Sequence, residues 1–145
     1  LMKVIPKPVY FISLLGLLPV IAGVVGSFNF LHLGEEINHF LYEFGLLFSA
    51  LILSFLGGCI FTFEILLKPK LELKGIALSV APTIWATIAI NSPIPSFLLA
   101  IGFLATLERE RILVRNLKLP AWWLKMRLQL TSLMVFALIL MGFNE

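Results

Sequence analysis

The segment ALILSFLGG, Ala50 to Gly58, is an uninterrupted apolar stretch whose small residues recur four positions apart. Ala50, Ser54 and Gly58 therefore lie along one face of a helix, with Gly57 beside them. Helix backbones approach closely where side chains are small, and such contacts associate helices in a membrane, where lipid offers no hydrophobic gradient. The stretch predicts a membrane helix that packs against other helices.

Apolar runs of similar length fill the rest of the chain. With 60% hydrophobic and 13% charged residues, the chain cannot form the water-facing shell of a soluble domain, for which about 25% charged residues are typical. Because one span needs about 20 residues, the 145 residues leave no room for a separate soluble domain. We predict an all-α integral membrane bundle, a single domain of five transmembrane helices at about 9–31, 42–66, 75–90, 95–112 and 121–143.

Two local features refine these spans. Pro19 lies in the middle of the first run and should bend that helix, because proline removes a backbone donor. The polar link HLGEEINHF, residues 32–40, can form a helix that begins near Gly34 and continues into the second span. Such a helix would be about 50 Å long against a hydrocarbon core of about 30 Å. Part of it must then protrude or lie along the membrane surface.

The charged residues predict the orientation of the bundle. With five spans, all 11 basic residues fall on one side of the membrane: Lys3, Lys7, Lys68, Lys70, Lys74, Arg109, Arg111, Arg115, Lys118, Lys125 and Arg127. The other side carries Glu35, Glu36, Glu43 and Glu145 and no basic residue. By the positive-inside rule, the N-terminus is inside and the C-terminus is outside. Topology thus accounts for the net charge of +3 without a nucleic-acid partner.

Small residues of the second span are the predicted helix-packing positions: Gly45, Ser49, Ala50, Ser54, Gly57 and Gly58. Contact within the bundle is the preferred interpretation, and contact with another protein is the alternative. Near the end of this span, Glu64 precedes Lys68 by four residues. That spacing favours a structural ion pair, although an ionisable residue in a span is also a functional candidate.

The start of the fifth span has the composition of a membrane–water interface. Trp122 and Trp123 suit that interface, and Lys125 and Arg127 are expected to extend their charged ends outward from the span. We therefore predict that these residues are interface anchors.

The chain resembles a known family at ALILSFLGG and at LPAWWLKMRLQLT, residues 119–131. Its further landmarks, GLLP at residues 16–19 and SVAPTIW at residues 79–85, follow in the same order. The family consists of small multi-span proteins grouped as a domain of unknown function and includes the mitochondrial transmembrane protein 69. The resemblance implies a bacterial inner membrane or the mitochondrial inner membrane, and it brings no established activity and no catalytic residue.

Reactive groups are scarce. His32, Glu36 and His39 are the candidate metal ligands, since a helix would align them and zinc accepts both residue types; a solvated helix face is the preferred interpretation. The serines in the spans have no histidine that could reach them as a base. We therefore predict no enzyme activity, no catalytic residue and no cofactor, with lipids around the spans.

Two functions fit these observations. The first is a non-catalytic accessory or assembly subunit of a larger inner-membrane complex, with a respiratory-chain complex as the first choice. The alternative is a small binding or transport protein for a hydrophobic ligand such as a quinone, a lipid or a haem precursor. The expected partners are membrane lipids and other membrane-protein subunits, with no nucleic acid.

Overall fold

The structure, a computed structural model, describes residues 4–145, and within this range its regular secondary structure is all α-helix. Its elements are α1 (Lys7–Leu15), α2 (Leu18–Phe28), α3 (Glu35–Leu66), α4 (Leu73–Ile90), α5 (Pro95–Val114) and α6 (Ala121–Gly142). The predicted all-α class is confirmed. Each predicted span corresponds to one helix, or in the first case to the pair α1 and α2.

Four helical segments are long and apolar enough to cross a membrane: Lys7–Phe28, which combines α1 and α2, Glu35–Leu66, Leu73–Ile90 and Ala121–Gly142. These segments indicate a membrane protein. α5 differs from them because Glu108, Arg109, Glu110 and Arg111 lie in its last turns. The fifth span therefore stays a prediction.

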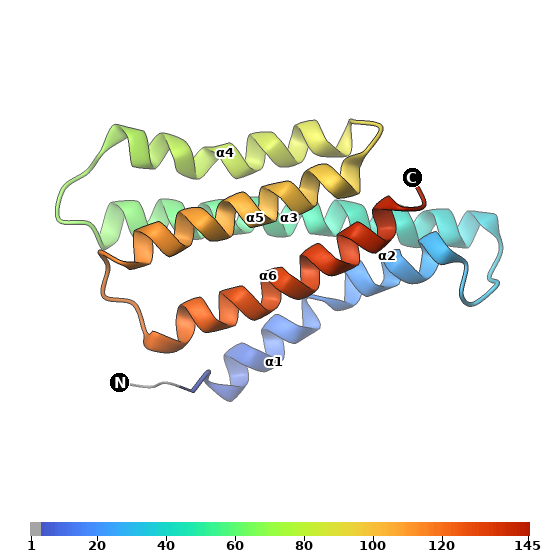
Figure 1. The fold of residues 1–145 in the computed structure, drawn as a ribbon, viewed down its shortest axis with the longest axis horizontal. Coiled ribbons are helices and arrows are strands. Elements are labelled where there is room, and N and C mark those ends of the chain that lie inside the picture. The colour runs from blue at the N-terminus through green and yellow to red at the C-terminus, as the bar shows by residue number, and fades with distance from the viewer. Residues whose placement is uncertain (1–3) are drawn as a thin grey trace.

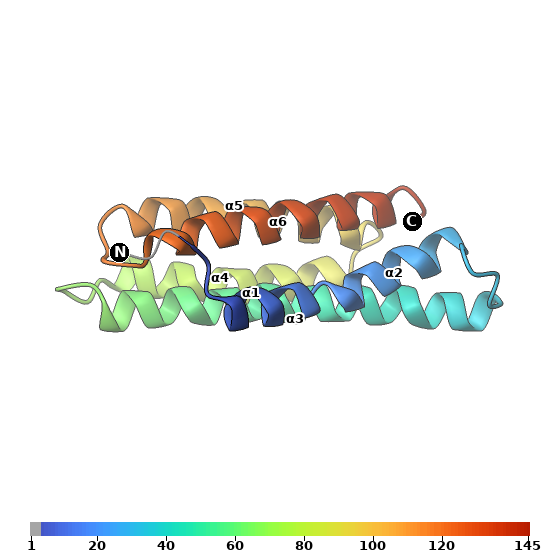
Figure 2. The same ribbon diagram turned by 90° about the horizontal axis from the view of Figure 1, so that it is seen from below.

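The bundle has two layers, with α5 and α6 above α3 and α4 in Figure 2. α3 is the central element and packs against α2, α4 and α5, while α6 packs against α5 and α2. The fully buried side chains between the layers include Leu53, Leu99, Phe103, Leu138 and Met141. As expected, α3 is one continuous helix of 32 residues. Its first turns extend with α2 beyond the ends of α4, α5 and α6 (Figure 1).

The first predicted span, in which Pro19 predicts a bend, is divided into two helices just before that proline. α1 ends at Leu15, and α2 begins at Leu18 with the proline in its first turn, where a missing N–H costs little. α1 has no buried residue and packs lightly against α6. Figure 1 shows α1 turned away from α3. The break therefore separates α1 from the central helix.

Glycines set the closest helix contacts. A Cβ atom on Gly45 would lie 2.7 Å from Cα of Gly23, so α2 and α3 touch backbone to backbone. A Cβ on Gly57 would lie 2.7 Å from the carbonyl oxygen of Ser79 in α4. α3 thus meets one neighbour through Gly45 and another through Gly57.

The other predicted packing positions of α3 differ in how deeply they are buried. Ser49 and Ala50 are buried inside the bundle, Ser54 is half-buried, and Ser49 donates its hydroxyl hydrogen to the Gly45 carbonyl at 2.7 Å. Gly58 corrects the prediction, because a Cβ there would meet no atom within 4 Å. It is exposed because α4 packs on the face that carries Gly57, and a neighbouring helical position points about 100° away.

The basic residues gather toward one end of the bundle. The links 67–72 and 115–120 lie at the end that also holds the start of α1, and we call this the basic end. The links 29–34 and 91–94 and the C-terminal Glu145 lie at the opposite, acidic end. Lys3, part of the predicted partition, lies outside the described residues.

Candidate functional site

Two carboxylates are fully buried near the basic end, Glu64 of α3 and Glu110 of α5, each with 0% exposure. Transfer of an unpaired carboxylate into an apolar interior is very costly, so such groups persist only with charged partners. The partners of these two residues define the candidate site.

Glu64 joins three helical segments. The Arg109 guanidinium of α5 donates from Nη2 to Oε1 of Glu64 at 2.7 Å. Lys68 Nζ lies 2.9 Å from Oε2 of the same carboxylate, which confirms the predicted ion pair. Gly75 of α4 packs so closely that a Cβ atom there would overlap the carboxylate. Glu64 therefore holds α5 to α3 under a glycine of α4.

Glu110 joins α5 to α6. The Nε–H of Arg127 is shared between the carboxylate oxygens at 3.0 Å for Oε1 and 3.2 Å for Oε2. Trp123 Nε1 donates to Oε2 at 3.2 Å, and its ring meets Phe63 edge to face at a centroid distance of 5.5 Å. Charge-assisted bonds of this kind are stronger than neutral ones.

This pair corrects the prediction that Arg127 is an interface anchor. Arg127 has only 5% exposure and lies inside the bundle, because burial of Glu110 requires a cation beside it. Lys125, two residues earlier, is exposed. Trp122 and Trp123 are half-buried, and Trp123 supports the ion pair.

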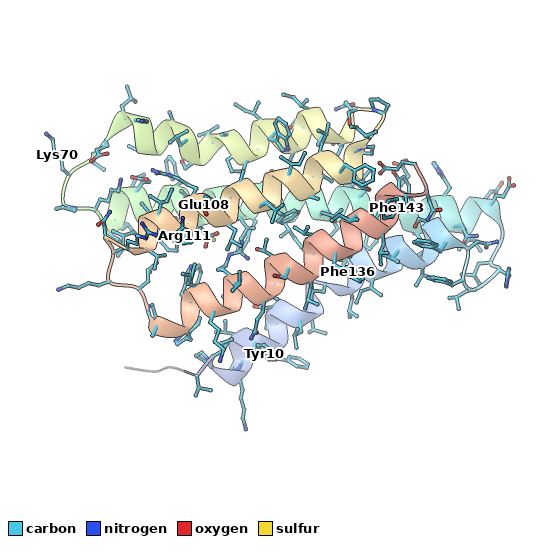
Figure 3. All side chains as sticks on the ribbon, viewed as in Figure 1. Tyr10, Lys70, Glu108, Arg111, Phe136 and Phe143 are labelled. Carbon is cyan, nitrogen blue, oxygen red and sulfur yellow. The ribbon has the colours of Figure 1, made fainter. Side chains whose placement is uncertain are left out.

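A nearby pair shows the contrast between buried and exposed charges. Arg111 donates from Nε to Glu108 at 2.9 Å, and both side chains are substantially exposed. Figure 3 shows both residues on α5, at the same end of the bundle as Lys70. Helical rotation places Arg109 and Glu110 against neighbouring helices while Glu108 and Arg111 point outward.

A cavity of about 300 Å³ lies beside the Glu110–Arg127 pair, between α1, α3, α5 and α6. Its walls come from α1, α3, α5 and α6 and are mainly apolar: Ile12, Ser13, Gly16, Leu17, Phe48, Ile52, Phe55, Leu56, Phe103, Arg127, Leu130, Thr131 and Met134. Among the described residues, the buried Nη2 of Arg127 and Oγ1 of Thr131 have no hydrogen-bond partner. An open, mainly apolar pocket with a few polar residues in its lining is typical of a ligand site.

A family model described as a protein of unknown function (DUF3429) matches residues 5–143. The chain belongs to the DUF3429 family. This match confirms the resemblance to a family that is grouped as a domain of unknown function. No curated protein and no solved structure matches the chain.

The recognised motifs of this DUF3429 chain lie at the contacts described above. SVAPTIW, residues 79–85, supplies Ser79 and Pro82, which face Gly57. LPAWWLKMRLQLT supplies Trp123, Arg127 and Thr131, which contribute to the ion pair and the cavity. The motifs therefore mark helix contacts and one side of the candidate pocket.

The predicted metal ligands of the DUF3429 chain do not share a helix face. His32 precedes α3 and has a positive φ of 51°, so it is out of register with Glu36 and His39. His39 lies 3.7 Å from Glu43, and both are exposed. Between residues 4 and 145, no three His, Cys, Asp or Glu side chains are grouped closely enough to hold a metal ion.

Sequence reasoning missed the Glu110–Arg127 pair and the Arg109 partner of Glu64. A usable signal was present, because Arg109 and Glu110 are adjacent and must face different neighbours when α5 is helical. A carboxylate on the buried face of α5 requires a cation from another helix, and Arg127 lies in the next one.

Proposed function

We propose that this DUF3429 protein is a non-catalytic membrane protein that holds an apolar molecule between its helices. The observation that carries the proposal is the cavity beside Arg127, whose lining includes a buried arginine with an unpartnered N–H group. A buried donor without a partner costs about 1–3 kcal/mol. If the Arg127 side chain turns toward the cavity, a ligand that accepts this hydrogen bond recovers part of that cost.

The surroundings of the cavity support an apolar ligand. Its volume of about 300 Å³ is at the lower end of the range of known ligand pockets, about 300–1,000 Å³. α1 forms one wall of the cavity, has no buried residue and makes few contacts with α6. α1 can therefore move with little loss of packing. A molecule dissolved in the membrane would then enter beside α1.

Native mass measurement after extraction in mild detergent tests the proposal. We expect the 16.2 kDa chain to retain a small apolar molecule. Ile52→Trp should lose it, because Ile52 lines the cavity and the larger indole fills the space. Leu51→Trp is the matched control, since Leu51 is exposed and outside the cavity. Equal ligand retention in both variants would contradict the proposal.

An accessory subunit of a larger inner-membrane complex, with the respiratory chain as the expected setting, is the second candidate. It is favoured by the end of α3 that extends past the bundle, where Ile37, Phe40 and Phe44 are exposed and the two phenylalanine rings stack at 6.1 Å. Apolar residues beside Glu35 and Glu36 suit a protein partner. In the same mass measurement, a particle containing other protein subunits would favour this candidate.

We further propose five spans with the basic end inside, in a bacterial or mitochondrial inner membrane; kinship with the mitochondrial transmembrane protein 69 would favour the latter. The gathering of basic residues at one end supports this orientation. In a Cys59→Ser background, cysteines placed at Asn38 and Asn116 should react with an impermeant thiol reagent from opposite sides. Reaction of both from one side would refute five spans.

A further inference from the structure

The cavity beside Arg127 also has a defined polar chemistry. Resting on the proposed function, we propose that its ligand carries a neutral hydrogen-bond acceptor, a carbonyl oxygen, and that Arg127 and Thr131 donate to it. The carbonyl of a quinone and the ester carbonyl of an uncharged lipid share this chemistry.

Arg127 can only donate hydrogen bonds, whereas the hydroxyls of Thr131 and Ser13 in the lining can donate or accept them. Arg127 uses its Nε–H for Glu110 and leaves Nη2 without a partner, and the Thr131 hydroxyl is likewise unpartnered in the described part of the chain. The two residues are four apart on α6, so they lie on one face of that helix. Both oxygens of Glu110 already accept hydrogen bonds from Arg127, and one of them also accepts from Trp123. A ligand group that bonds to both Arg127 and Thr131 must therefore accept hydrogen bonds, because Arg127 can only donate them.

The charge of the lining selects a neutral acceptor. The positive charge of Arg127 is balanced by Glu110, which has 0% exposure. An anionic ligand would add a negative charge that nothing compensates in an apolar interior, at a cost of several kcal/mol before relaxation. A carbonyl oxygen accepts the same hydrogen bonds without that charge.

The other cations at this end do not change the balance inside the cavity. Arg109 and Lys68 surround Glu64, and Lys68 also lies 3.7 Å from Glu72. Neither cation lines the cavity. The side chains of Arg109 and Lys68 are 27% and 17% exposed, respectively. Solvent or lipid headgroups therefore screen the charges of these two residues more than the charge of Arg127.

The remaining lining matches the apolar part of such a ligand. Aromatic and aliphatic side chains of α3 and α5 form the opposite wall, among them Phe48, Ile52 and Phe103. Ser13 of α1 contributes a hydroxyl whose contact is the Met126 sulfur at 3.8 Å, a weak acceptor. Carbonyl oxygens remain better acceptors than that thioether.

The proposal is tested with three probes of similar length on the full chain in nanodiscs: the methyl ester of dodecanoic acid, a quinone with a decyl tail, and dodecanesulfonate, which stays ionised. Titration calorimetry gives each Kd. We expect at least one neutral probe to bind, and the sulfonate to bind at least about tenfold more weakly, because its charge would be uncompensated. Comparison of the ester with the quinone identifies the source of the carbonyl.

Single-residue variants test whether the acceptor group of the ligand binds at this site. Thr131→Val removes one donor with little change of shape and should weaken the better neutral probe about fivefold, the size of one ordinary hydrogen bond. Ser132→Ala is the control, because that hydroxyl is exposed and bonded to the Leu128 carbonyl. Glu110→Gln leaves Arg127 unbalanced and should reverse the preference toward the sulfonate. If Glu110→Gln does not fold, the comparison of probes on the unchanged chain still decides.

The outcomes separate this inference from the proposed function. Sulfonate binding as tight as that of the neutral probes, displaced by Ile52→Trp, would overturn the inference and leave the ligand-binding function standing. Unchanged neutral binding in Thr131→Val would also overturn it. If no probe binds in a manner sensitive to Ile52→Trp and no native ligand is retained, the proposed function itself fails.

Discussion

Gly45→Ala should lower the free energy of unfolding by about 3 kcal/mol, the upper part of the range for overpacked cores. The new Cβ would lie 2.7 Å from Cα of Gly23 and 2.8 Å from the carbonyl oxygen of Pro19. Both are backbone atoms, so α2 and α3 must separate to accommodate the methyl group. Reversible unfolding in mixed detergent micelles measures the change.

The control for this variant lies on the same helix. Gly58→Ala places its Cβ where no atom lies within 4 Å. Alanine is favoured over glycine in a helix by up to about 1 kcal/mol, so this variant should be as stable as the original chain or slightly more stable. Equal destabilisation by both variants would contradict the backbone contact between Gly45 and Gly23.

Arg127→Met should lower the free energy of unfolding by about 3–5 kcal/mol, because it leaves the Glu110 carboxylate buried without a counter-charge. The double variant Glu110→Gln with Arg127→Met should recover much of this loss, since it removes both charges. A double-mutant cycle built on the same unfolding measurement gives the coupling between the two residues.

An exposed pair on the same helix provides the comparison. Glu108→Gln should leave the unfolding transition unchanged, because Glu108 and Arg111 are solvent-accessible and such pairs contribute little. If Arg127→Met proves as mild as Glu108→Gln, the Glu110–Arg127 pair is not buried as described.

Much of the fold follows from patterns that are local in sequence. Apolar runs bounded by prolines and charged links predict the spans, and Pro19 predicts a bend where the structure divides the first span into α1 and α2. The spacing of Glu64 and Lys68 predicts an ion pair within one helix. These features require only the geometry of a single helix.

The candidate site could not be predicted in the same way, because it depends on which helices become neighbours. In the sequence, Arg127 has the position expected of a membrane-interface residue. Its burial becomes evident only when α6 is packed against Glu110 of α5. Gly57 and Gly58 are indistinguishable in sequence, yet only the face that meets α4 is packed. The cavity depends further on how α1 is placed against α6, which no spacing encodes.

The two buried carboxylates also constrain how the chain is made. Glu64 precedes Arg109 by 45 residues, and Glu110 precedes Arg127 by 17 residues. At about 5–20 residues per second of synthesis, Arg109 is synthesised roughly 2–9 seconds after Glu64. Lys68 is available to pair with Glu64 earlier. Glu110 has no cation on the next turn of its own helix that contacts it, so in the proposed five-span arrangement the end of α5 should remain in the headgroup region until α6 emerges. Insertion of the last two helices is then a joint event, and release of a chain truncated before α6 should leave α5 accessible to proteases.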